Sequence, residues 1–141
     1  MTAAMLAATA AGVFALKLRR LEASGPQRLI GSLRFSQWTA LLLAATGAVS
    51  IGLAVAHESA PSGTVDVTIG AAFVLFGGFI LTREPREALL VVAAGFFAHA
   101  LVDVAHRPGL FGPGLAPRWY AVGCAVFDLY VAALCYWVHR R

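Results

Sequence analysis

The sequence has few charged residues: 11 Lys and Arg together with 7 Asp and Glu make up 13% of its 141 residues. Soluble domains average about 25% charged and about 45–50% apolar residues, whereas this chain is 60% hydrophobic and has a mean hydropathy of +0.77. A water-soluble globular fold is therefore excluded. Cysteine is also scarce, and because the two cysteines, Cys124 and Cys135, lie in one apolar segment, a disulfide framework is excluded. Walker, Rossmann and nucleophile-elbow motifs are absent.

The apolar residues gather in five runs, and each bilayer crossing needs about 20 such residues. We predict an all-α integral membrane protein with one transmembrane domain, 1–141, and five transmembrane helices at about 2–17, 38–56, 67–82, 88–106 and 119–138. The basic residues of the first run follow its apolar core, so we expect a retained span and not a cleaved signal peptide.

A basic connector, 18–37, separates the first two predicted spans. Ser24 and Gly25 precede Pro26, a pattern typical of a helix start. We expect a short amphipathic helix that lies on the membrane surface, with an irregular solvated loop as the alternative.

The basic residues are distributed unevenly between the two sides of the predicted bundle. One side carries nine of them: Lys17, Arg19, Arg20, Arg28, Arg34, Arg83, Arg86, Arg140 and Arg141. The other side carries Arg107 and Arg118. The positive-inside rule then predicts an N-terminus outside and a C-terminus in the cytoplasm, in the cell inner membrane. Because the pI of about 9.7 follows from this asymmetry, no nucleic-acid partner is expected.

Two predicted spans carry ionisable side chains at positions that share a helix face. His99, Asp103 and His106 are spaced i, i+4, i+7 in the fourth span, which places them on one side. The fifth span has a similar stripe, made of Tyr120, Cys124, Asp128 and Cys135. The two spans are antiparallel neighbours, so the stripes can face each other at matching depth.

Ionisable groups inside a membrane are costly and mark functional sites by default. We predict a metal site for Zn, Fe or Cu whose candidate ligands are His99, Asp103, His106, Cys124 and Asp128. Asp103 and Asp128 are also candidate catalytic carboxylates, and Tyr120 is a candidate for binding a cofactor or ligand. Two other interpretations stay open: a His–Asp proton relay or ligand pocket, and a structural His–Asp pair that fixes helix register.

Other polar residues have simpler interpretations. His57 and Glu58 end the second span on the side of the predicted site and are candidate additional ligands. Asp66 is expected to cap the N-terminus of the third span. His139 is attributed to topology, next to two arginines, and Cys135 is expected to be a small buried hydrophobic residue.

A ridge of small residues recurs every four positions in the second span: Ala44, Ala48, Gly52 and Ala56. Small residues let another helix approach closely, which favours packing between helices in lipid. The ridge therefore predicts a helix–helix interface, within this chain or with a larger membrane complex.

The segment HALVDVAHRP (99–108), followed by APRWYAVGCAVFD (116–128), resembles a group of small multi-pass bacterial membrane proteins. These proteins pair a helix of the pattern HxxxDxxH with a following helix of the pattern CxxxD. The resemblance covers the last third of the chain and implies no particular activity. It implies one shared site for His99, Asp103, His106, Cys124 and Asp128. Membrane hydroxylases and desaturases need many more histidines than the four present, so a complete di-iron site is not expected.

We therefore expect a membrane-embedded metal-binding protein with a His/Asp site open to the outer face. A metal-dependent hydrolase or oxidoreductase acting on a lipid or other apolar substrate fits this site. The alternatives are a non-catalytic accessory or assembly subunit of a larger membrane complex, and a proton-coupled small transporter or channel. The expected partners are the lipid bilayer, an apolar ligand or lipid, and further copies of the chain or other subunits.

Overall fold

A computed structural model describes residues 2–22, 24–56, 63–105 and 117–140. The described residues form five α-helices: α1 (Thr2–Arg20), α2 (Pro26–Ala56), α3 (Gly63–Ile80), α4 (Pro85–Ala105) and α5 (Arg118–His139). All five are long and apolar enough to cross a membrane. The predicted class, an all-α protein with five membrane-spanning helices, is confirmed at that level, and the orientation in the membrane stays a prediction.

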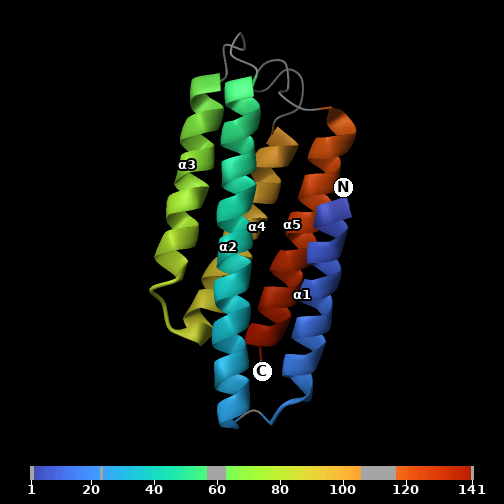
Figure 1. Cartoon of the computed structure of the whole chain (residues 1–141), viewed down its shortest axis with the longest axis vertical. Coiled ribbons are helices and arrows are strands. Elements are labelled where there is room, and N and C mark those ends of the chain that lie inside the picture. Colours follow the sequence, from blue (N-terminus) through green and yellow to red (C-terminus); the bar gives the residue numbers. More distant parts are fainter. Residues whose placement is uncertain (1, 23, 57–62, 106–116, 141) are drawn as a thin grey trace.

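The five helices run roughly along the long axis of the molecule (Figure 1). α2 packs mainly against α3, and α4 packs mainly against α5, while α1 lies against α5 and α2. The lower end in Figure 1 holds the C-terminal ends of α1 and α5 and the short turn between α3 and α4. The upper end holds the C-terminal ends of α2 and α4 and the N-terminal ends of α3 and α5.

The bundle has an apolar core and an apolar surface. Phe35, Val92 and Phe96 are fully buried, whereas Met5 and Leu75 are 68% and 75% exposed. Water disfavours so much exposed apolar surface, but the acyl chains of a bilayer solvate it. The surface of the helices therefore agrees with their length and composition in indicating a membrane environment.

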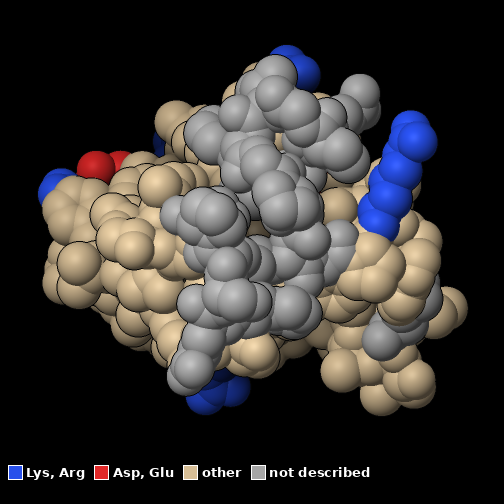
Figure 2. Space-filling view, turned by 90° about the horizontal axis from the view of Figure 1, so that it is seen from above, with Lys and Arg blue, Asp and Glu red and all other residues tan. Residues whose placement is uncertain are grey.

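The basic residues are gathered at the lower end. The described basic residues there are Lys17, Arg19, Arg20, Arg28, Arg34, Arg83, Arg86 and Arg140. Seen from above, most of the described surface is uncharged and the charged side chains lie toward its margins (Figure 2). Among the described residues, Arg118 is the basic residue that belongs to the upper end.

The expected division between a surface helix and a second span does not occur. α2 continues from Pro26 to Ala56 as one helix of 31 residues, about 46 Å at 1.5 Å per residue. No proline interrupts it after Pro26, and Phe35 and Thr39 are buried in the core where the break was expected. The same apolar face therefore continues through the connector into the span.

Arg28, assigned to topology by its charge, also has a structural role. Its side chain is buried, and its guanidinium donates to the backbone oxygens of Leu18 at 2.8 Å and Val138 at 3.4 Å. These oxygens belong to the last turns of α1 and α5, where helix carbonyls lack partners within the helix. Arg28 thus joins three helices at the lower end of the bundle.

The small-residue ridge of α2 contacts a neighbouring helix over part of its length. Gly77 of α3 packs against Ala44, whereas nothing lies within 4 Å of a Cβ added at Gly52. The closest approach between α2 and α3 is at Gly47 and Gly70, where a Cβ on either residue would lie 2.5 or 2.6 Å from the other's carbonyl oxygen. Steps of four residues rotate about 40° around the helix each time, so the ridge turns away from α3.

Candidate functional site

The polar stripes of α4 and α5 meet inside the bundle. Nδ1 of His99 donates a hydrogen bond to Oδ2 of Asp128 at 2.7 Å, and it lies 3.6 Å from Oδ2 of Asp103. One ligand atom from each of these three residues lies within 4.8 Å of the other two. The spacing of His99 and Asp103 by one helical turn places both on the face of α4 that Asp128 reaches from α5.

The neighbouring aromatic ring of Phe73 fixes the position of the imidazole. Phe73, from α3, meets His99 edge to face with ring centroids 4.7 Å apart and an interplanar angle of 72°. His99 is therefore held by a carboxylate on one side and an aromatic ring on another. Three different helices, α3, α4 and α5, contribute to its orientation.

The cluster is deeply buried and rich in acceptor atoms. His99 is 4% exposed and Asp128 0% exposed. The second carboxylate oxygen of Asp128, Oδ1, has no hydrogen-bond partner among the residues that the structure describes. A buried carboxylate oxygen without a donor is costly, so the site favours a bound cation or a donor group.

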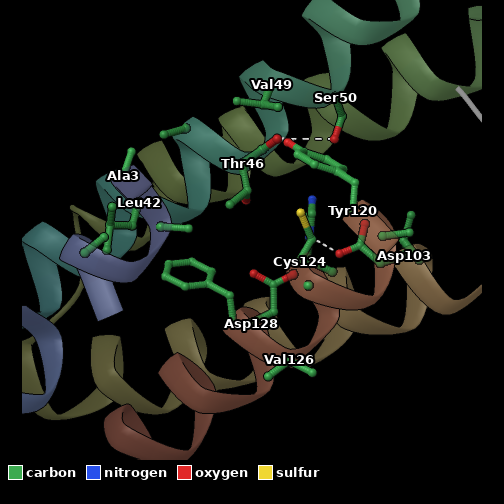
Figure 3. A pocket seen from close by; sticks show the side chains of 18 of the residues that line it. Ala3, Leu42, Thr46, Val49, Ser50, Asp103, Tyr120, Cys124, Val126 and Asp128 are labelled. Atoms are coloured by element: carbon green, nitrogen blue, oxygen red, sulfur yellow. Dashed lines mark hydrogen bonds and ion pairs between the residues drawn. The ribbon is translucent and has the colours of Figure 1, made fainter. Parts of the chain in front are cut away.

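A cavity of about 670 Å³ adjoins the cluster, and described residues from all five helices line it. Figure 3 shows Ala3 and Leu42 on one side of this cavity, with Asp103, Cys124 and Asp128 on the other. None of the described residues that line it is Lys or Arg. The acidic side chains thus face a space whose described wall contains His99 but no Lys or Arg.

Tyr120 and Cys124 line the same cavity one helical turn apart. The side chains of Tyr120 and Cys124 lie close enough to interact with each other. Cys124 is not part of the group formed by His99, Asp103 and Asp128, whose ligand atoms lie within 4.8 Å of one another. The structure therefore places Tyr120 and Cys124 beside the cluster, as residues that line the cavity.

Three of the candidate ligands named from sequence lie outside the described residues. They are His57, Glu58 and His106. The other two histidines of the chain, His99 and His139, are described and are far apart in the fold. Nδ1 of His139 lies 2.9 Å from the backbone oxygen of Arg86 at the lower end, so it connects α5 with α4. The sequence pattern indicated a role for His139 in topology alone and did not predict this contact.

Sequence analysis missed several polar residues of the cavity wall. Thr46 and Ser50 reach the cavity from α2, and Asp66 reaches it from α3. The expectation that Asp66 caps α3 is wrong, because the helix begins at Gly63 and Asp66 is a buried residue of its first turn. The spacing of Thr46 and Ser50 by one turn was a signal that could have identified a polar face on the second span.

Cys135 is fully buried in the core, as expected for a small hydrophobic residue. It shares a helix with Cys124 and Asp128 but does not line the cavity. Of the polar stripe predicted on α5, Tyr120, Cys124 and Asp128 therefore line the cavity and Cys135 does not.

Comparison of the chain with protein-family models, with curated proteins and with solved structures finds no match. The functional argument therefore depends on the geometry of the site.

Proposed function

We propose that this chain is a membrane-embedded protein that binds a divalent transition metal, Zn, Fe or Cu, through His99, Asp103 and Asp128. The observation that carries the proposal is the convergence of one imidazole and two carboxylates within 4.8 Å inside an apolar bundle. Imidazole and carboxylate groups are common ligands of these metals.

Charge balance supports a cation at this position. When the imidazole is neutral, as a metal ligand must be, the cluster with two ionised carboxylates carries two negative charges, and no Lys or Arg is present in the described wall of the cavity. Ionised carboxylates are not stable in a low-dielectric interior without a partner. A divalent ion would neutralise both and would also satisfy Oδ1 or Oδ2 of Asp128.

The distances within the cluster are close to those of a metal site. Two ligands of one tetrahedral zinc ion lie about 3.3–3.6 Å apart, given bonds of about 2.0–2.2 Å. The 3.6 Å between His99 Nδ1 and Asp103 Oδ2 is near this value, while the 2.7 Å to Asp128 is a hydrogen-bond distance. Binding at Nδ1 would therefore replace the proton of this hydrogen bond and lengthen the separation slightly.

We also propose that the site opens toward the outer face of the cell inner membrane. The cluster is formed by the C-terminal half of α4 and the N-terminal half of α5, which belong to the upper end of the bundle. The basic residues gathered at the lower end favour a cytoplasmic location for that end.

Three protein ligands leave a coordination position for a substrate, which is the arrangement typical of catalytic metal sites. A metal held there would supply Lewis-acid chemistry to an apolar substrate in the cavity. The carboxylate oxygen of Asp103 that does not bind the metal is the one best placed to accept a proton from such a substrate, because this side chain is 18% exposed.

Metal analysis of the purified protein tests the proposal. We expect about one equivalent of Zn, Fe or Cu in the wild type and a loss of at least tenfold in His99→Ala. His139→Ala is the matched control, because it removes a histidine from the lower end and should leave the metal content unchanged. Metal-free wild-type protein, or equal metal in His99→Ala, would overturn the proposal. Proton flux in liposomes and co-purifying subunits would then distinguish the transporter from the accessory subunit.

A further inference from the structure

The cavity beside the cluster is much larger than a metal ion requires. Its volume of about 670 Å³ lies within the range of about 300–1,000 Å³ that small-molecule pockets occupy. A methylene group is about as large as a water molecule, whose share of liquid volume is about 30 Å³. The cavity therefore has room for one long alkyl chain with a small head.

Apart from Met5, α1 lines the cavity with small side chains. The residues concerned are Ala3, Ala4, Ala7 and Ala8. They recur at helical spacing, and Figure 3 shows Ala3 on the side of the cavity opposite Cys124 and Asp128 of α5. Larger residues at these positions would occupy the space, so the cavity depends on this alanine face of α1.

The cavity opens on the surface that faces lipid. Met5, Val49 and Trp119 line it and are 68%, 48% and 60% exposed, so they border its mouth. They belong to α1, α2 and α5, and all three are apolar or amphipathic. In a membrane this mouth is in contact with acyl chains, so a molecule dissolved in the bilayer can enter without crossing water.

The polar groups at the inner end determine which head group fits. The carboxylates of Asp103 and Asp128 offset the charge of a divalent ion, so a charged head group is attracted less strongly there than to the bare ion. It would still lose its hydration on entering the cavity, which is more costly for an ion than for a hydroxyl. An uncharged oxygen can occupy the remaining coordination position of the metal.

We infer that the cavity binds a single-chain amphiphile with an uncharged hydroxyl head, taken up laterally from the bilayer. The alkyl chain lies against the alanine face of α1, and the hydroxyl oxygen points toward His99, Asp103 and Asp128. The choice of head group depends on the proposed metal site, while the cavity and its mouth belong to the protein alone.

Native mass spectrometry of the zinc-loaded protein in detergent tests this inference with three probes: 1-hexadecanol, hexadecanoate and hexadecyltrimethylammonium. We expect a one-to-one adduct with the alcohol at a concentration about tenfold lower than with either charged probe. Ala8→Phe fills the cavity and should weaken alcohol binding at least tenfold. Ala10→Phe is the matched control, since Ala10 lies on the same helix, is exposed and does not line the cavity. It should change alcohol binding less than twofold.

The zinc content of each sample, measured in parallel, separates the two proposals. Zinc-loaded wild-type protein with no alcohol adduct, or with equal binding of the three probes, overturns this inference and leaves the proposed function intact. Equal alcohol binding by Ala8→Phe and Ala10→Phe also overturns it, because the probe would then lie outside the cavity. Protein that takes up no zinc overturns the proposed function itself and, with it, the choice of head group.

Discussion

His99 is the residue on which the site depends, and three neighbours determine its position. Asp128 accepts its Nδ1 hydrogen, Asp103 lies one turn away on the same helix, and the ring of Phe73 packs against it. Helical spacing in the sequence predicted that His99 and Asp103 share a face. It could not predict the contact between Phe73 and His99, because that contact depends on how α3 and α4 pack.

The His99–Asp128 hydrogen bond should contribute measurably to stability in the metal-free protein. In a double-mutant cycle with His99→Ala and Asp128→Ala, we expect a coupling free energy of about 0.6–1.7 kcal/mol, as for other polar pairs between membrane helices. SDS-induced unfolding followed by circular dichroism measures it. The equivalent cycle for His99 and Asp103, at 3.6 Å, should give a smaller value. Coupling of His99 and Asp128 indistinguishable from zero would contradict the assigned hydrogen bond.

At the scale of the elements, the sequence predicted five helices and approximately where each lies. Hydropathy was sufficient for this because each span must be apolar over about 20 residues. It was not sufficient for α2, where Arg28 and Arg34 suggested a surface segment although the apolar face continues through them. Buried Arg28 could not be foreseen, since its partners are carbonyl groups of α1 and α5.

The contact between α2 and α3 gives a prediction with a control on the same helix. Gly47→Ala adds a methyl group 2.5 Å from the carbonyl oxygen of Gly70, so the helices must separate. We expect a loss of about 1–3 kcal/mol in unfolding free energy, as for other overpacked interfaces.

Gly52→Ala is the control for this prediction, because nothing lies within 4 Å of the added methyl group. Alanine has a higher helix propensity than glycine by up to about 1 kcal/mol, so Gly52→Ala should be neutral or slightly stabilising. Both variants can be compared by SDS-induced unfolding. If Gly47→Ala were as stable as Gly52→Ala, the close approach of α2 and α3 at Gly47 would be wrong.

For the whole molecule, the sequence predicted which residues can meet but not the space beside them. The stripes of α4 and α5 were expected to face each other, and the structure brings His99 and Asp128 into contact. The cavity was not foreseeable, because it arises where small residues of α1 stand opposite α2 and α5. Such a space depends on how several helices pack against one another at once.

The orientation in the membrane is testable in a cysteine-free background, Cys124→Ala with Cys135→Ala. A cysteine at the exposed Thr82, in the lower turn between α3 and α4, should react with a membrane-impermeant maleimide only after the cells are permeabilised. A cysteine at the exposed Arg118, at the start of α5, should react in intact cells. The opposite labelling pattern would place the site on the cytoplasmic side and contradict the predicted topology.

The central claim is that His99, Asp103 and Asp128 bind a metal, and X-ray absorption spectroscopy of the zinc-loaded protein tests it most directly. The account predicts nitrogen and oxygen ligands at about 2.0–2.2 Å, with outer-shell scattering from one imidazole. That imidazole signal should disappear in His99→Gln. A sulfur ligand at about 2.3 Å would assign the metal to Cys124 instead, and would contradict the account.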